Sequence, residues 1–293
     1  MVAGRPLWAH LSGDVAYTGA TDFPRAGPRA GQRFVEGFMR TRPSFLLIVL
    51  LSLLLPAPAL AGLPETVALV RPAVVGVGTL QATRRPPAKL LGTGFVIGDG
   101  TLVVTNAHVV PEVLAVEDKE YLAVFAGRGK HPQRRRAKQV AMDLKHDLAI
   151  LRIEGNPLPM LQLGDSDRVR EGESIAFTGF PIGAVLGLYP ATHHGLVSTI
   201  SPIVLPAQSG RQLTAGMIRR MRDPFDIFQL DATAYPGNSG SPLYLPKTGE
   251  VVGVVNMVFV KETKEAVLEK PSGIAYAIPI KYLKALLATV KEE

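Results

Sequence analysis

The apolar residues of this chain fall in many short runs rich in β-branched side chains, and Gly, Pro and Asp separate these runs. Short runs of this kind, with turn residues between them, predict an all-β barrel or sandwich. Two sets of candidate strands follow each other along the chain. The first set comprises residues 74–79, 91–97, 102–105, 121–125, 138–143 and 148–153. The second comprises 174–180, 196–200, 227–230, 242–245, 251–260 and 273–277.

Helical spacing is rare, and its clearest instance lies near the end of the chain. Residues 280–290 carry leucines and other aliphatic side chains at helical spacing, with lysines on the opposite face. This period predicts a closing helix that packs one face on the β-structure.

Residues 231–242 place one serine, Ser239, inside a tight turn bounded by glycines. A serine hydroxyl is a poor nucleophile at neutral pH, so a reactive one needs a general base and N–H donors for the oxyanion that it creates. Gly237 and Gly240 permit such a turn, and the N–H groups of Gly237 and Ser239 are the candidate donors. The same stretch is also good chemistry for an ordinary hairpin loop.

Two upstream residues could activate that serine. His108 ends a buried, β-branched run at 102–110, and Asp147 follows His146 at the start of another buried run, 148–151. A carboxylate there could orient an imidazole and stabilise its charged form. His108, Asp147 and Ser239 occur in the order His, Asp, Ser, which is the order of chymotrypsin-type β-barrels.

Further motifs accompany these three in a fixed order. They are Gly-Thr-Gly-Phe-Val-Ile at 92–97, Leu-Gly-Asp-Ser-Asp at 163–167, Gly-Leu-Val-Ser at 195–198 and Gly-Ile-Ala-Tyr-Ala-Ile-Pro at 273–279. Together with the triad, they resemble the protease domain of the HtrA/DegP family over residues 64–284. The resemblance implies two six-stranded antiparallel barrels of the trypsin fold, about 64–170 and 171–279, followed by the closing helix. His108 and Asp147 would come from the first barrel and Ser239 from the second.

The sequence departs from this family at two positions. Ser241 stands where the family usually has a second glycine, and Tyr235 stands where it usually has asparagine. Neither belongs to the triad, but both lie near the expected substrate position.

In the trypsin fold, the residues just before the nucleophile and the strand after it form the walls of the primary pocket. Here the candidate pocket residues are Thr233, Ala234, Tyr235, Val255 and Met257. These walls contain no acid that could pair a buried cation. By resemblance, the nearby Asp231 belongs to a structural segment. We therefore predict cleavage after small or medium aliphatic residues.

The triad and the resemblance together predict a serine endopeptidase that acts on exported, unfolded or damaged polypeptides. The first alternative is a weak or inactive relative that binds peptides in the same cleft, and the second is an esterase with the same triad. None of these activities implies a metal or a cofactor. The chain has no cysteine, which excludes disulfides and thiolate metal sites.

Composition and net charge limit the classes of binding partner that this chain is expected to have. With 47% hydrophobic and 19% charged residues, the chain is globular. The net charge is +7, but six of the 32 Lys and Arg and three of the 25 Asp and Glu lie in residues 1–61. The remainder has 26 basic and 22 acidic residues, a net charge of +4. This mild excess is not the charge pattern of a nucleic-acid-binding protein. Two basic clusters are interpreted as solvated loops, with docking to acidic partners or an anionic membrane as the alternative. They are Lys130, Arg134, Arg135, Arg136 and Lys138, and Arg219, Arg220 and Arg222.

The N-terminal part is typical of an export signal. Residues 39–61 have two arginines, a leucine-rich core and a small-residue cleavage site after Ala61, whereas 1–38 reads as a disordered or untranslated leader. We predict initiation at Met39 and a mature chain, 62–293, that starts at Gly62. The alternative is a retained membrane anchor, although the apolar core is short for a span. No PDZ domain is expected after the closing helix.

Overall fold

The computed structural model describes residues 62–181, 188–203, 223–256 and 273–290. The predicted leader and signal segment therefore lie outside the described residues. So do Met257 of the predicted pocket and the second basic cluster, Arg219, Arg220 and Arg222.

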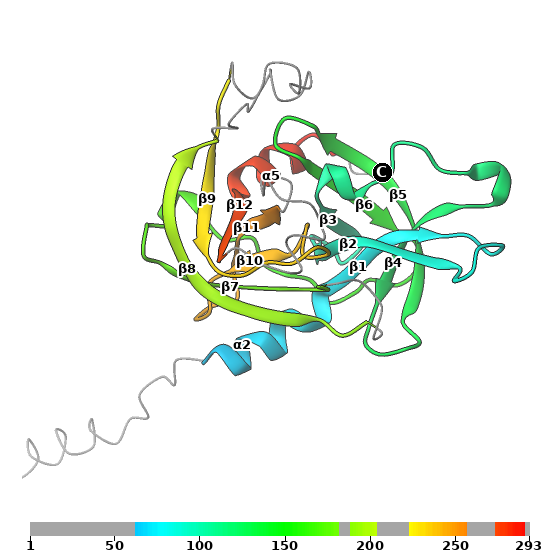
Figure 1. Cartoon of the computed structure of the whole chain (residues 1–293), viewed down its shortest axis with the longest axis horizontal. Helices are drawn as coiled ribbons and strands as arrows, with labels where there is room; N and C mark the ends of the chain where they lie inside the picture. Colours follow the sequence, from blue (N-terminus) through cyan, green and yellow to red (C-terminus); the bar gives the residue numbers. More distant parts are fainter. Residues whose placement is uncertain (1–61, 182–187, 204–222, 257–272, 291–293) are drawn as a thin grey trace, which may run out of the picture. The chain divides into compact units, whose positions relative to one another are not determined.

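The described strands form two closed antiparallel barrels of six strands each (Figure 1). The first barrel has the order β1-β2-β3-β6-β5-β4 and the second has the order β10-β11-β12-β9-β8-β7. This confirms the predicted all-β, two-barrel fold. In the first barrel the strands are β1 (Val74–Leu80), β2 (Ala88–Ile97), β3 (Leu102–Thr105), β4 (Tyr121–Ala126), β5 (Gln133–Asp143) and β6 (Leu148–Ile153). In the second they are β7 (Ser174–Gly179), β8 (Ala191–Pro202), β9 (Asp226–Asp231), β10 (Pro242–Tyr244), β11 (Val251–Asn256) and β12 (Ile274–Pro279).

The burial of each strand explains whether its boundaries could be predicted from the apolar residues of the sequence. Every residue of β1 and β11 is buried, so their apolar runs mark them well. The two long strands β5 and β8 are largely exposed over part of their length, and their polar halves hid the true starts.

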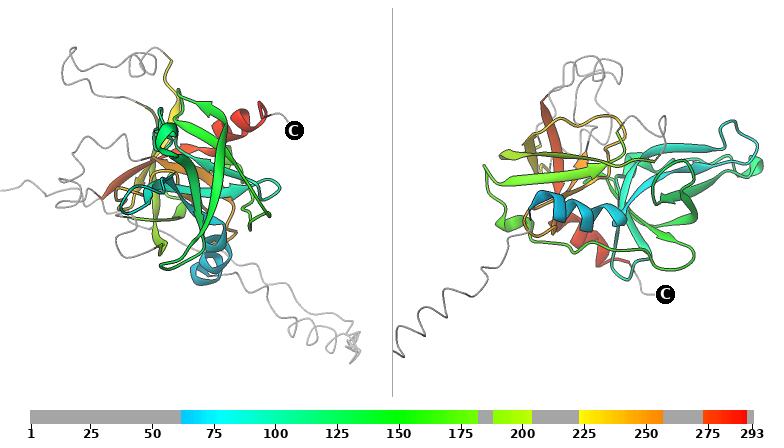
Figure 2. Two further views of the ribbon diagram at one scale, coloured as in Figure 1. Left: turned by 90° about the vertical axis from the view of Figure 1, so that its right-hand side faces the viewer. Right: turned by 90° about the horizontal axis from the view of Figure 1, so that it is seen from below.

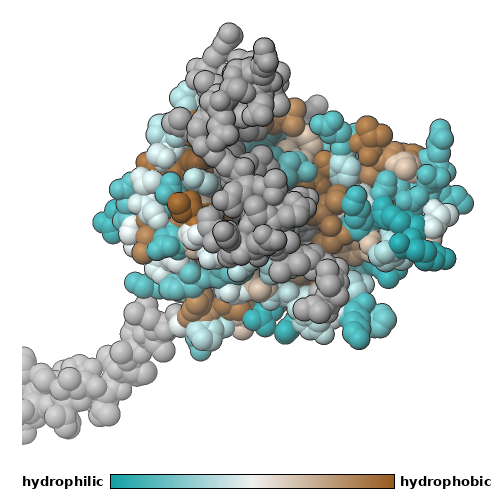
Figure 3. Space-filling model, viewed as in Figure 1, coloured by the Kyte–Doolittle hydropathy of each residue, from teal (hydrophilic) through white to brown (hydrophobic). Residues whose placement is uncertain are grey.

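The first basic cluster was expected in a solvated loop, but most of it lies in a strand. Arg134, Arg135, Arg136 and Lys138 lie within β5 and are not in a loop, because the backbone of β5 pairs with β4 and β6. The side chains of Arg134, Arg136 and Lys138 are exposed, and that of Arg135 is partly buried. Lys130 alone of this cluster precedes the strand. Hydrophilic residues also gather over the first-barrel end of the molecule in the space-filling view (Figure 3).

Among the described residues, two α-helices accompany the barrels, and both are visible from below (Figure 2, right). The closing helix α5 (Ile280–Leu287) buries Ile280, Leu283 and Leu286 in the cluster that includes the first-barrel core, and it is shorter than the predicted 280–290. The helix α2 (Leu63–Val70) was not predicted from the sequence. The hydroxyl of its Thr66 donates to the carbonyl of Pro246, 2.6 Å away. No helix within the described part of the chain is long and apolar enough to cross a bilayer.

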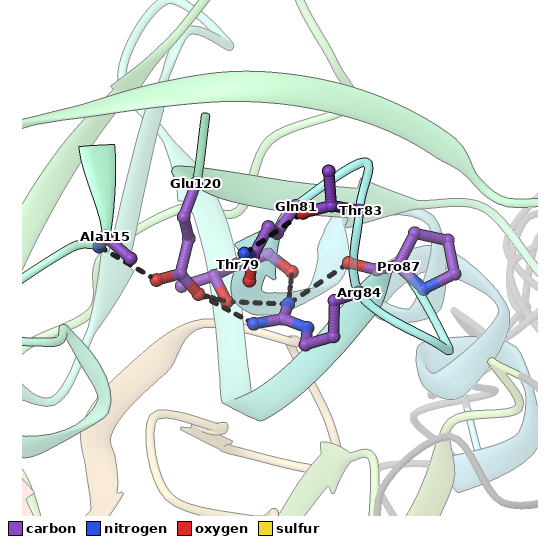
Figure 4. Close-up of polar contacts among 7 residues, drawn as sticks. All are labelled: Thr79, Gln81, Thr83, Arg84, Pro87, Ala115 and Glu120. Atoms are coloured by element: carbon purple, nitrogen blue, oxygen red, sulfur yellow. Dashed lines mark hydrogen bonds and ion pairs between the residues drawn. The ribbon is translucent and has the colours of Figure 1, made fainter. Parts of the chain in front are cut away.

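A carboxylate network ties the β1–β2 hairpin to the segment before β4 (Figure 4). Glu120 Oε1 accepts from the Thr79 hydroxyl at 2.6 Å and from Arg84 Nη1 at 2.7 Å, and Oε2 accepts from the Ala115 N–H at 3.1 Å. These contacts, the Thr79 bond foremost, lower the pKa of Glu120 from 4.5 to about 2. The ionised form of Glu120 therefore holds the two segments together.

We expect Glu120→Gln to lower the free energy of unfolding by about 2 kcal/mol at pH 7, because charge-assisted hydrogen bonds are lost. A pKa depressed in the folded state contributes stability above pH 4.5, and that contribution is lost as the pH falls towards 2. The difference between the two proteins should shrink over this range in urea titrations. Glu117→Gln, at an exposed carboxylate nearby, is the control, and a difference that is constant with pH would contradict the assignment.

Candidate active site

The turn between β5 and β6 holds Asp147 in a left-handed backbone conformation, with φ of 54°. Aspartate tolerates this conformation better than most residues, but it needs support from its surroundings. Its carbonyl accepts from the Ala107 N–H at 3.1 Å and from Asn106 Nδ2 at 3.0 Å. The segment after β3 thus fixes the backbone of Asp147, whose residue surface is only 5% exposed.

The same segment brings His108 to the Asp147 carboxylate. His108 lies in a short 3₁₀ turn, η2 (Ala107–Val109), which directly follows β3. Its N–H donates to Asp147 Oδ1 at 2.9 Å, and its Nδ1 is 2.6 Å from Asp147 Oδ2. Because an ionised carboxylate only accepts, Nδ1 carries the proton in this pair and Nε2 is left to accept another.

A residue of the second barrel completes this contact. Asn256, the last residue of β11, donates from Nδ2 to Asp147 Oδ2 at 2.6 Å. Its side chain is fully buried. Sequence reasoning did not assign this role, although a polar residue that directly follows the apolar run 251–255 was a usable signal.

The loop around Ser239 contains two glycines with left-handed backbone conformations. Gly237 and Gly240 have φ of 101° and 87°, and a Cβ on Gly240 would come within 2.0 Å of the Thr93 carbonyl oxygen. Within the described residues, the N–H groups of Gly237 and Ser239 donate no hydrogen bond. Both groups are therefore available to an oxygen of a bound substrate.

Thr93 of β2 attaches this loop to the first barrel. Its N–H donates to the Ser239 carbonyl at 2.9 Å, and its hydroxyl donates to the Gly237 carbonyl at 2.7 Å. The same hydroxyl accepts the Phe180 N–H at 3.0 Å. Thr93 is fully buried, and the Gly-Thr-Gly motif in the sequence did not reveal this role.

The segments that carry Ser239 and His108 both pack on β2 at Gly92. A Cβ on Gly92 would be 2.7 Å from Val109 Cγ2 and 3.0 Å from the Ser239 carbonyl oxygen, so both segments pack on the same point of the strand. Among the described residues, the Ser239 hydroxyl makes no hydrogen bond to His108. Such contacts are often long without substrate and shorten in the reacting complex.

Four of the five predicted pocket residues lie among the described residues of the second barrel. Ala234 and Val255 are buried in its apolar core cluster, whereas Thr233 and Tyr235 are partly buried. None of these four side chains carries a charge, and Asp231 is exposed at the end of β9.

His146, the neighbour of Asp147, points to a different part of the molecule. Its Nδ1 pairs with Asp143, and its ring stacks on Tyr282 of α5 with a centroid distance of 4.2 Å. Burial raises the pKa of Asp143, but the hydrogen bonds from His146 outweigh it and lower that pKa overall. The contact therefore anchors the turn that carries Asp147 to the closing helix.

Comparison with known proteins agrees with this geometry. The family model described as a trypsin-like peptidase domain matches residues 92–254, which include His108, Asp147 and Ser239. The chain belongs to the trypsin-like peptidase family.

Relatives place this peptidase domain near the HtrA group. It is 32% identical to a probable periplasmic serine endoprotease DegP-like of Pseudomonas putida over 68% of this chain and 35% of that protein. It is 33% identical to serine protease HTRA4 of Homo sapiens over 76% of this chain and 40% of that protein. The chain thus spans between about a third and two fifths of these curated relatives.

Solved structures show the same fold. The HtrA-type protease AlgW with a tripeptide matches with a TM-score of 0.56 and 24% identity, covering 78% of this chain and 63% of that one. A protease of M. tuberculosis in its active form matches with a TM-score of 0.57 and 25% identity, covering 81% of this chain and 88% of that one.

In this peptidase domain the unusual Ser241 carries a buried hydroxyl. Its Oγ has no hydrogen-bond partner among the described residues, and neither do the amide atoms of the buried Asn238. The backbone of Gly179 packs closely against both side chains: a Cβ on Gly179 would lie 2.0 Å from Ser241 Oγ and 2.9 Å from Asn238 Oδ1. An unpaired buried hydroxyl costs stability.

We expect Ser241→Ala to leave the free energy of unfolding unchanged or to raise it by up to about 1 kcal/mol, since the lost hydroxyl has no partner to leave behind. Ser166→Ala is the matched change, because Ser166 is also buried and its hydroxyl accepts the Lys281 N–H at 3.2 Å. The free energy of unfolding of Ser166→Ala should fall by about 1 kcal/mol. Urea unfolding compares the two, and equal losses would show that Ser241 has a partner after all.

Proposed function

We propose that this chain is a serine endopeptidase in which Ser239 is the nucleophile, His108 the general base and Asp147 the group that orients His108. The observation that carries the proposal is the pair of hydrogen bonds from His108 to Asp147, at 2.9 and 2.6 Å. They fix the imidazole with Nδ1 protonated and Nε2 free to accept, as a general base for a hydroxyl must be.

The chemistry follows from these positions. His108 Nε2 removes the hydroxyl proton as Ser239 Oγ attacks the scissile carbonyl, and the N–H groups of Gly237 and Ser239 receive the oxyanion. The protonated imidazole then passes its proton to the leaving amine, and water hydrolyses the acyl enzyme by the reverse sequence. The ionised Asp147 carboxylate stabilises the transient imidazolium.

Asn256 supports the same step as a positioning residue. Its amide bond to Asp147 Oδ2 occupies one lone pair of the oxygen that faces His108 Nδ1, which restricts rotation of the carboxylate. The second barrel thereby contributes to the base as well as to the nucleophile. A displacement of the second barrel would therefore impair the general base His108 and the nucleophile Ser239 together.

The substrates that we propose are unfolded or damaged polypeptides outside the cytoplasm. Support comes from the names of the DegP-like relatives, which are periplasmic, and from the signal-like pattern of residues 39–61. The pocket walls Ala234 and Val255 carry no charge, which favours small or medium aliphatic residues before the cleaved bond.

Replacing either Ser239 or His108 by alanine should abolish peptide hydrolysis, and the double variant should be no worse than either single one, because the two act as a unit. Cleavage of an unfolded protein is measured with Ser166→Ala as an active control. A fluorophosphonate probe should label the native chain and fail on Ser239→Ala. Labelling of a different serine would refute the assignment, and an absence of labelling in the native chain would favour the peptide-binding alternative.

Cleavage-site mapping in a denatured protein should give cuts after valine, alanine and residues of similar size. Basic residues should be rare at that position, because no buried carboxylate is available in the described walls to pair a cation. Peptide products are identified by mass spectrometry, with Ser239→Ala as the blank. Predominant cuts after lysine or arginine would contradict the pocket.

A further inference from the structure

A histidine lies on the inner face of the second barrel, beside the predicted pocket. His193 of β8 pairs in register with Phe177 of β7, and their rings stack with a centroid distance of 4.8 Å and an interplanar angle of 19°. Phe177 is fully buried in the same core cluster as Ala234 and Val255. The His193 ring is therefore in contact with the cluster that forms two of the pocket walls.

The same face of β8 lies against the segment that leads to Ser239. Gly195, two residues on and so on the same face as His193, has no room for a side chain: a Cβ there would be 2.8 Å from Ala232 Cβ and 2.1 Å from the Asp231 carbonyl oxygen. The ring of Tyr235 is 5.9 Å from the ring of His193. This tyrosine is one of the two departures from the family pattern.

One nitrogen of His193 lacks a partner. Nε2 is buried and makes no hydrogen bond within the described part of the chain. Burial also lowers the pKa of His193, so the ring is neutral at pH 7. A neutral imidazole nitrogen is a donor or an acceptor, and leaving either one buried and unpaired costs free energy.

We propose that His193 is a specificity-determining residue of the primary pocket, and that its Nε2 binds the hydroxyl of a threonine or serine side chain placed before the cleaved bond. This rests on the proposed peptidase function and refines its pocket. The apolar walls Ala234 and Val255 set the size of the side chain, and the unpartnered Nε2 of His193 adds a hydrogen-bonding position beside them.

A hydroxyl is the group that suits this position best. It both donates and accepts, so it satisfies Nε2 in either neutral tautomer, while its small volume suits the pocket. Valine has the shape of threonine but leaves Nε2 unpaired. A site built around a buried polar group discriminates against the analogue that lacks its partner, so threonine and valine form the matched test pair.

The experiment measures kcat/KM for two peptides that differ only in threonine or valine before the cleaved bond. We expect the native chain to favour threonine by about tenfold, the value of one added hydrogen bond. His193→Phe retains a ring for stacking on Phe177 and should reverse the preference. His193→Gln, which keeps a hydrogen-bonding group, should restore part of it.

The matched control is His194→Ala. His194 is exposed on the opposite face of β8, where its Nε2 is 2.8 Å from the Ser174 hydroxyl, so its loss should leave the ratio unchanged. Fluorophosphonate labelling of Ser239 is measured in every variant. A native chain that is not labelled would overturn the peptidase function itself. Normal labelling with a threonine-to-valine ratio that is the same in the native chain and in His193→Phe would overturn only the role of His193.

Discussion

The hydroxyl of Thr93 is the contact on which the site depends most. It is fully buried between the two barrels, donates to Gly237 and accepts from Phe180, while the backbone of the same residue binds Ser239. A serine loop with two left-handed glycines has no regular secondary structure of its own, so its shape must be imposed from outside. Thr93 imposes it from the first barrel, which also carries His108 and Asp147.

The reverse contact runs from the second barrel to the first. Asn256 of β11 donates to the carboxylate of Asp147 at 2.6 Å. Each barrel therefore completes the part of the site that the other one carries. Because these hydrogen bonds are buried and short, a shift of one barrel against the other breaks several of them together and leaves polar groups unpaired.

The sequence predicted the two barrels well, because buried strands carry a local apolar pattern. The structure brings His108 and Asp147 into contact, but their catalytic roles stay predictions. Buried strands such as β11 stand out as apolar runs, and the chain order of the three residues restricts the topology. The polar starts of β5 and β8 were missed, because exposed strand residues such as Arg134 carry no hydrophobic signal. Helix α2 was missed because it is short and its burial depends on distant residues, among them Pro246.

The contacts of Thr93, Asn256 and His193 could not be predicted for a related reason. Each depends on two strands or loops far apart in the chain meeting side by side, and a single buried polar residue looks the same in sequence whether or not it finds a partner. Only the register of β7 with β8 shows that His193 faces inward and His194 outward. One residue of slip would exchange them.

Ser241 and Gly179 also bear on how this chain could have diverged. With serine at 241, a methyl group at 179 would collide with its hydroxyl oxygen at 2.0 Å, so the two positions cannot both grow. A Cβ at position 179 would also lie 2.9 Å from Asn238 Oδ1 and 3.0 Å from Thr93 Oγ1. Glycine at 179 is thus what leaves room for the serine at 241, and the effects of substitutions at these two positions should not add.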